Sequence, residues 1–344
     1  MLDRFGEAAV TEASFFHTGR WQTWSADARF AYYTAGTLKH PQVVRRELAS
    51  GVEETIDGDL EGASPADAPL LSGLLGMLHA AGDGTGRHEP EASPVPFPDR
   101  SAHGLFQHSF DPPRSRLALS VDAVLAEHPD RDSLLRLDSQ VRAETGEGLS
   151  LMTYCVRWSP DGTRLLFYFG NHLAFIGRGE PRVAHVMTST PDLRDIRVAL
   201  RLGEGRPGVH WSWQPDGEHL IGYGPDPDDP RRMCLAEVRF DGTGYRRLSE
   251  HDSGGHPSVS PVDPDLIVTD EPTEAGGAVV FLSRRTGGIV RRIELPRFRP
   301  GSEVRGRSRL HVDHHPVFSA DGAVVHANVL PDEHARIAVL ESPR

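Results

Sequence analysis

A tight turn of the type Ser-Pro-Asp-Gly recurs along this chain, and it constrains the fold more than any other feature. In its clearest copy, Ser159-Pro160-Asp161-Gly162, the proline presets φ at the first central position and the glycine accepts a positive φ. Short runs of β-branched, aromatic and aliphatic residues flank this turn, which predicts a pair of strands. The seven copies of the turn begin at Ser25, Ser64, Asp111, Ser159, Gln214, Ser260 and Ser319.

The spacing of the copies predicts a β-propeller. Successive copies lie roughly 40 to 60 residues apart, and a repeat of about 45 residues built from short strands is typical of propeller blades. The 344-residue chain contains 35 Gly and 27 Pro and shows no long amphipathic helical blocks, so an all-β fold is expected. We therefore predict a seven-bladed β-propeller as a single domain over residues 1–344, with six blades as the alternative because the second copy is degenerate.

The turns also predict where each blade lies. The last turn is followed by only two expected strands, so a strand within residues 5–16 is predicted to complete and close the last blade. The predicted blades lie near residues 15–58, 59–102, 103–150, 151–205, 206–252, 253–310 and 311–344 plus 5–16.

Charge and composition limit the partners of the protein. The net charge of −12 argues against a broad surface for nucleic acid, although a local basic cavity for an acidic substrate remains compatible with it. The segment from Met1 to Glu7 has no basic region leading into an apolar core, and no run of 18 apolar residues follows. We therefore expect a cytoplasmic protein with no membrane partner, whereas the oligomeric state is not predicted.

Histidine is the residue type that stands out, with 18 copies. Four residues before each turn, where the first strand of a blade begins, the last three copies carry His210, His256 and His315. The equivalent strands of neighbouring blades lie side by side, so these three imidazoles are predicted to converge. A single histidine at such a position can instead cap its strand by bonding to a backbone carbonyl, and this alternative stays open.

The segment His311-Val312-Asp313-His314-His315, together with His256, suits a divalent metal ion. The predicted ligands are therefore His256, His311, His314 and His315, and the predicted metals are Mn, Zn or Ca. In an extended strand His311 and His315 face one side and His314 faces the other, so all three can bind one ion only if the strand is irregular.

Three stretches resemble the β-propeller polysaccharide lyases, a group that includes oligogalacturonate lyase, the propeller ulvan lyases and the rhamnose–glucuronate lyases. These stretches are Gly255–Pro261, Ile267–Asp270 and Asp313–Ser319. The spacing of His88, His108 and Tyr154 resembles the catalytic set of the ulvan-lyase-like members. The resemblance is diffuse and extends over most of residues 15–344. The stretch Phe169-Gly170-Asn171-His172 departs from it, because it lacks the arginine that neutralises the uronate carboxylate in those enzymes.

The resemblance implies a lyase that cleaves uronate-containing oligo- or polysaccharides by β-elimination. It implies that His108 is the base and that Tyr154 is the acid or a second base, and these two roles can be exchanged. It also implies that His88 and His210 hold the substrate carboxylate. Either Arg157, His172 or the metal replaces the missing arginine, or the chemistry differs from that of those enzymes. Two alternatives remain: a non-catalytic binding propeller of the TolB or WD40 type, and a metal-dependent propeller hydrolase or isomerase.

Overall fold

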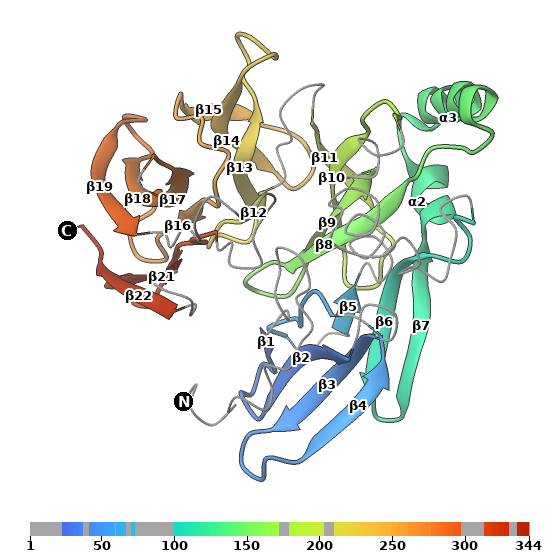
Figure 1. Ribbon diagram of the computed structural model, residues 1–344, viewed down its shortest axis with the longest axis horizontal. Helices are drawn as coiled ribbons and strands as arrows, with labels where there is room; N and C mark the ends of the chain where they lie inside the picture. Colours follow the sequence, from blue (N-terminus) through green and yellow to red (C-terminus); the bar gives the residue numbers. More distant parts are fainter. Residues whose placement is uncertain are drawn as a thin grey trace, which may run out of the picture. The chain divides into compact units, whose positions relative to one another are not determined.

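The protein, described by a computed structural model, is built almost entirely from antiparallel β-sheets (Figure 1). It divides into two compact units, Met1–Arg201 and Leu202–Arg344. No helix in the described part of the chain combines the length and apolar character that crossing a membrane requires. The structure describes residues 23–36, 41–58, 60–66, 70–72, 99–171, 179–202, 210–274, 276–296, 313–329 and 336–343.

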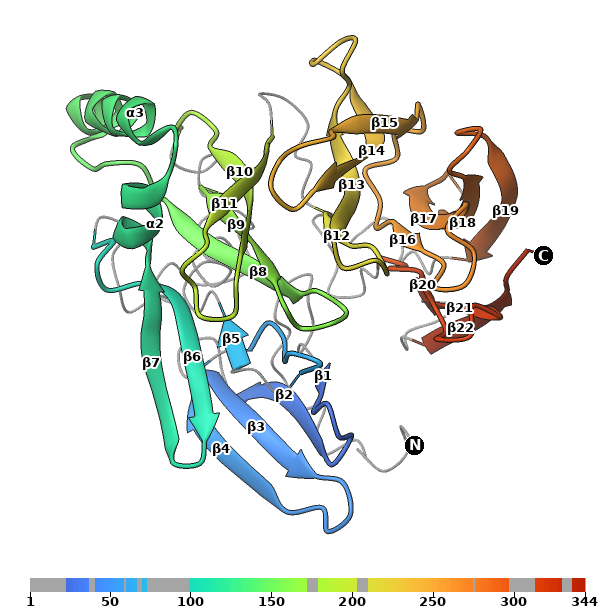
Figure 2. The ribbon, with the colours of Figure 1, turned by 180° about the vertical axis from the view of Figure 1, so that it is seen from behind.

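In the first unit, the described residues form three sheets and two helices. Figure 2 shows how these elements follow one another. The first sheet consists of β1 (Thr23–Trp24), β2 (Phe30–Gly36), β3 (Pro41–Glu47) and β4 (Glu53–Asp57). The second sheet consists of β5 (Leu70–Ser72), β6 (Gly104–Phe110) and β7 (Pro113–Ser120), and it leads into α2 (Val121–Glu127) and α3 (Arg131–Thr145). The third sheet consists of β8 (Met152–Trp158), β9 (Leu165–Gly170), β10 (Ala184–Ser189) and β11 (Arg197–Arg201).

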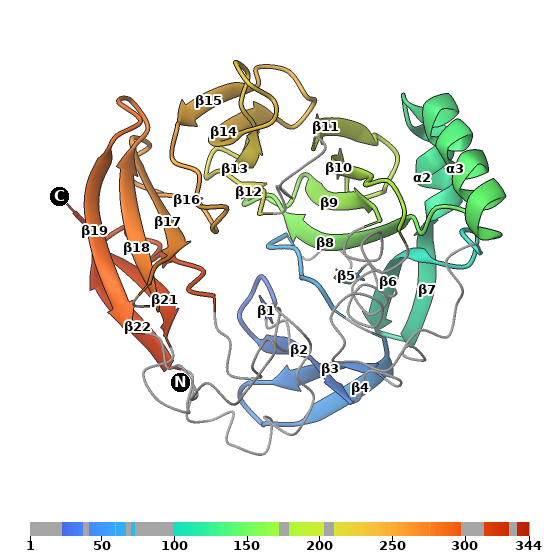
Figure 3. The same ribbon diagram turned by 45° about the horizontal axis from the view of Figure 1, so that its top comes forward.

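The second unit contains three sheets that pack against one another in chain order (Figure 3). The first consists of β12 (Ser212–Trp213), β13 (His219–Pro225), β14 (Met233–Arg239) and β15 (Arg246–Ser249). The second consists of β16 (Ser258–Val259), β17 (Leu266–Pro272), β18 (Gly276–Ser283) and β19 (Ile289–Pro296). The third consists of β20 (Val317–Phe318), β21 (Val324–Val329) and β22 (Arg336–Glu341).

The recurring turn forms as its residue types predict. In the copy between β8 and β9, the Ser159 hydroxyl donates to the Asp161 carboxylate at 2.6 Å, and the Gly162 N–H donates to the Ser159 carbonyl at 2.9 Å. Gly162 has φ +68°, and a Cβ added there would lie 2.6 Å from the Cβ of Ala66. Glycine is therefore required at this position both by backbone conformation and by close packing.

The prediction of seven blades is wrong, because the structure is a β-propeller of five blades. Among the described residues, five sheets show the blade pattern, in which the recurring turn joins the first strand to the second. In the sheet β5–β6–β7 the turn beginning at Asp111 joins the second strand to the third instead. Among the described residues of the predicted blades 59–102 and 103–150, one sheet and two helices are present. The strand predicted within residues 5–16 lies outside the described residues.

The helices α2 and α3 were not predicted, although their ends carry recognisable signals. The Ser120 hydroxyl accepts the N–H of Ala123 and caps α2, whereas Gly146 ends α3 in the left-handed conformation at φ +81°. Val124 and Leu134 pack from these helices into the core around β9. Burial of this apolar face therefore holds residues 121–145 as helices.

Candidate metal centre

Three histidines occupy the same position in three consecutive sheets of the second unit. His210, His256 and His315 each stand two residues before the first strand of their sheet, β12, β16 and β20 respectively. The structure brings their rings together: the centroids of His210 and His256 are 3.8 Å apart, and those of His256 and His315 are 3.5 Å apart. The shared register of the sheets places these imidazoles side by side, although 105 residues (315 − 210) separate the first from the last.

The hydrogen bonds of the first two rings determine which nitrogen carries the proton. His210 Nδ1 faces the carbonyl oxygens of Gly254 and Gly255 at 2.8 and 3.1 Å. His256 Nδ1 faces both oxygens of the Asp270 carboxylate at 3.0 and 3.1 Å. Carbonyl and carboxylate oxygens only accept, so Nδ1 donates in both rings and Nε2 of each neutral ring keeps its lone pair.

Asp270 lies at the centre of this arrangement and is nearly buried, with 8% of its side chain exposed. Its carboxylate accepts the backbone N–H groups of His256, His314 and His315 at 2.6, 3.1 and 3.3 Å. Burial alone would raise the pKa of Asp270, but the hydrogen bonds that His256 donates outweigh this effect and hold that pKa well below its usual range. Asp270 therefore stays ionised.

A carboxylate completes a possible set of metal ligands. One ligand atom each from His256, Asp313 and His315 lies within 4.8 Å of the other two. His256 and Asp313 are half-buried and His315 is exposed, so an ion can reach the group from solvent. The donors are two imidazoles and one carboxylate, a set suited to Mn or Zn. Asp313 is a candidate ligand that the sequence-based ligand set did not include.

His314 is directed elsewhere. Its Nδ1 donates to the Asn328 carbonyl at 2.7 Å, and a Cβ added to Gly277 would lie 2.2 Å from its Nε2. Its ring is therefore packed between β18 and β21, away from the group of His256 and His315. The backbone departs from a regular strand at the next residue, His315, which adopts φ +42°. His311 lies outside the described residues.

The remaining predicted catalytic residues that the structure describes belong to the first unit. His108 on β6 is buried, and its Nδ1 contacts the Ser115 hydroxyl at 2.8 Å. Tyr154 on β8 is buried and stacks on Tyr168 with ring centroids 5.3 Å apart, and burial raises its pKa well above the usual value. Arg157 lies half-buried on β8. His88 and His172 lie outside the described residues.

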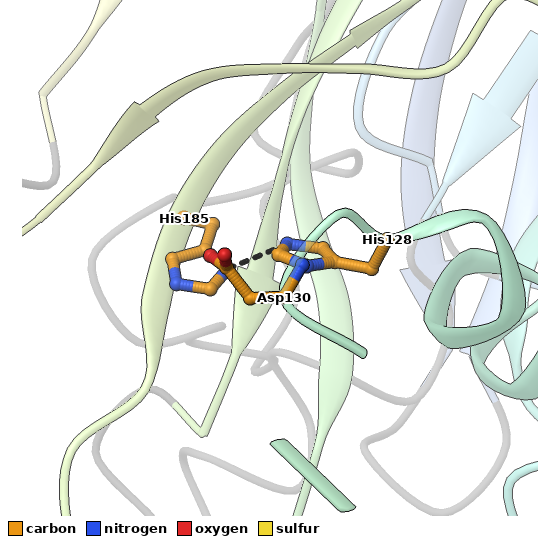
Figure 4. A group of neighbouring side chains, drawn as sticks. All are labelled: His128, Asp130 and His185. Atoms are coloured by element: carbon orange, nitrogen blue, oxygen red, sulfur yellow. Dashed lines mark hydrogen bonds between the residues drawn. The ribbon is translucent and has the colours of Figure 1, made fainter. Parts of the chain in front are cut away.

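A second cluster of His and Asp lies in the first unit and was missed by sequence analysis (Figure 4). His128 follows α2, Asp130 precedes α3, and His185 lies on β10. His128 Nε2 and His185 Nδ1 are 2.8 Å apart, and the rings stack with centroids 4.6 Å apart. No repeat places these residues together, and only the packing of α2 and α3 on the third sheet does so.

In this second cluster, His128 and His185 form a hydrogen-bonded pair. The backbone N–H of Asp130 donates to His128 Nδ1 at 3.0 Å, so Nδ1 accepts and the proton of the neutral ring lies on Nε2, from which it is donated to His185. The Asp130 carboxylate forms an ion pair with Arg201. An ion held by His128 Nε2 would require the proton on Nδ1, facing the Asp130 N–H. These contacts favour a structural role over metal binding.

Comparisons with known proteins show the fold. The sequence matches no protein-family model and no curated protein. The chain resembles the structure of an oligogalacturonate lyase in complex with manganese, with a TM-score of 0.58 and 14% identity over 94% of this chain and 77% of that chain.

Other propellers match less closely. A putative TolB from Agrobacterium tumefaciens gives a TM-score of 0.45 and 16% identity over 94% of this chain and 90% of that chain. A gluconolactonase from Xanthomonas campestris gives a TM-score of 0.45 and 10% identity over 96% of this chain and 88% of that chain. At 14% identity, the similarity to the oligogalacturonate lyase structure shows a shared fold and no more.

Proposed function

We propose that this protein is a metal-dependent lyase that cleaves uronate-containing saccharides by β-elimination. The observation that carries the proposal is the set of three adjacent imidazoles, His210, His256 and His315, beside the carboxylate of Asp313. Support comes from the fold that the chain shares with an oligogalacturonate lyase that binds manganese.

The residues present fit a divalent cation. His256 donates its Nδ1 proton to Asp270 and keeps Nε2 as a ligand, which is the arrangement in which carboxylates orient metal-binding histidines. His315 and Asp313 supply the other two donors. When bound, the cation supplies positive charge beside the substrate carboxylate, which stabilises the negative charge that develops there.

The elimination needs a base for the proton on the carbon next to the carboxylate. The electron pair of that C–H bond forms a double bond to the neighbouring carbon, whose bond to the glycosidic oxygen breaks, and the departing oxygen takes up a proton. His210 suits the base, because its ring lies against His256 and its Nε2 keeps a lone pair while Nδ1 donates to backbone carbonyls. The backbone carbonyls fix the orientation of this ring.

This proposal gives the base role to His210, whereas the sequence-based hypothesis gave it to His108. His108 is buried and engaged by Ser115, and the raised pKa of Tyr154 keeps its hydroxyl protonated near neutral pH, so no phenolate is present to act as a base.

The test is a lyase assay that follows the ultraviolet absorbance of the unsaturated uronate. The manganese-loaded protein is incubated with a panel of uronate-containing oligosaccharides, beginning with oligogalacturonates, and metal content is measured separately. We expect product from the unaltered protein, loss of turnover with retained metal in His210→Ala, and loss of both in His256→Ala. His219→Ala is the matched control, because His219 belongs to the same unit and its side chain bonds to Asp216 at a turn outside the site.

The two parts of the proposal can fail separately. A folded, manganese-loaded protein that releases no unsaturated product from any saccharide would contradict the lyase and favour the non-catalytic binding propeller. Full activity without bound metal, or in His256→Ala, would contradict the assignment of the metal ligands.

A further inference from the structure

Asp270 is a charged residue that follows a run of buried, mostly apolar residues in β17. The residues before it in β17, from Leu266 to Thr269, are buried, and every residue of β17 pairs with a residue of β18. Burying a carboxylate is costly unless hydrogen bonds replace its water. The neighbours of Asp270 therefore show what the side chain does.

The carboxylate accepts four different donors. They are the Nδ1–H and the backbone N–H of His256 and the backbone N–H groups of His314 and His315. An ionised carboxylate offers about four lone-pair positions, so these donors use its accepting capacity. Asp270 is consequently suited to holding the ligand-bearing segments and not to binding the ion itself.

The backbone of Asp270 holds the first of these segments as well. The Ser253 hydroxyl donates to the Asp270 carbonyl at 2.8 Å, and a Cβ added to Gly255 would lie 1.9 Å from that oxygen. Only glycine permits this approach. The segment from Ser253 to His256 is thus fastened to one residue at two points, and the orientation of the His256 ring follows from it.

The second segment is held in a strained conformation. His315 adopts φ +42°, in the left-handed region that non-glycine residues rarely occupy, and its N–H donates to Asp270. The same carboxylate oxygen accepts the N–H of His314. Asp270 therefore joins two segments that lie 45 residues (315 − 270) and 14 residues (270 − 256) away along the chain.

We propose that Asp270 is the positioning residue of the metal centre: it orients His256 and fixes the backbone that carries His315, and so determines the affinity of the site for a divalent ion. This inference rests on the metal site of the proposed function. Loss of such a supporting carboxylate costs metal affinity by about 10- to 100-fold.

The variant Asp270→Asn tests the proposal with little change in size. Its amide nitrogen cannot accept the backbone N–H groups, so one segment loses its anchor. We expect manganese affinity, measured by calorimetric titration of the full chain, to fall 10- to 100-fold, and turnover to recover at saturating manganese. Asp216→Asn is the matched control, because Asp216 also accepts two backbone N–H groups and a histidine Nδ1, but at a turn outside the site.

A second measurement needs neither a variant nor activity. Nitrogen-detected NMR of the metal-free, unaltered chain reports which nitrogen of His256 carries the proton, and we expect Nδ1. A proton on Nε2 overturns the proposal, as does an Asp270→Asn variant that binds manganese as tightly as the unaltered chain. If the unaltered chain binds no manganese, the proposed function fails, whereas the NMR result still decides whether Asp270 orients His256.

Discussion

Lowering the pH from 7.5 to 5 is expected to destabilise the first unit through the buried pair of His128 and His185. Burial lowers the pKa of His128 from 6.5 to about 4 and that of His185 from 6.5 to about 3. The Asp130 charge partly opposes this effect, and the Arg201 charge adds to it. The geometry agrees, because Nδ1 of His128 and Nδ1 of His185 each accept a hydrogen bond that an added proton on that nitrogen would disrupt.

The size of the effect follows from the difference in bound protons. The folded pKa values lie below the unfolded value of 6.5, so the stabilisation is complete above pH 6.5 and is lost as the pH falls toward the folded values. One pKa unit corresponds to about 1.4 kcal/mol, so each histidine costs about 2 kcal/mol at pH 5 and the pair costs about 4 kcal/mol. Domains are typically stable by only about 5–15 kcal/mol.

The assay is urea unfolding at several pH values between 7.5 and 5, comparing the unaltered chain with His185→Asn. The asparagine oxygen keeps an acceptor near the position of Nδ1 but does not titrate, so we expect the loss between pH 6.5 and 5 to fall by about half. His219→Asn, at a half-exposed histidine, is the control for removing a histidine. Equal losses in the unaltered chain and His185→Asn would refute the reasoning.

Three further predictions concern packing, a buried ion pair and the metal. Gly222→Ala is expected to lower the free energy of unfolding in urea by about 1–3 kcal/mol, because its Cβ would lie 2.4 Å from the Trp211 ring. Gly62→Ala is the control, since its Cβ would have no contact below 3.6 Å, and equal losses in the two variants would contradict this prediction. Arg100→Ala should lower the free energy of unfolding in urea by about 3–5 kcal/mol, because it removes the guanidinium that pairs with the buried Asp138 carboxylate. A loss below about 1 kcal/mol would disprove this prediction. Removing the metal with a chelator should lower the thermal midpoint, since a ligand at 100 times its Kd adds about 2.7 kcal/mol, and an unchanged midpoint would argue against a bound ion.

The local elements of the fold could be predicted from sequence because their causes are local. Turn residues with restricted or permissive φ and short apolar runs predict hairpins without knowledge of the rest of the chain. The copies beginning at Ser159 and Ser319 form the expected turns, with Gly162 and Gly322 at positive φ. The same register places His210, His256 and His315 at equivalent positions, which is why sequence alone could predict that they converge.

The number of blades could not be predicted in this way. A turn of the same type at Asp111 joins a different pair of strands, and residues 121–145 form helices because their apolar side chains pack on the core around β9. Strand pairing and helix packing depend on contacts between distant segments, which a local pattern does not specify.

By itself, then, the sequence determined that the chain forms repeated antiparallel hairpins and that three histidines share one position in the repeat. Only the tertiary structure decided that Asp270 joins the segments of His256 and His315 and that His314 turns away from them. The physical reason is that a turn depends on the φ preferences of adjacent residues, whereas the role of a buried carboxylate depends on which donors the folded chain brings to it.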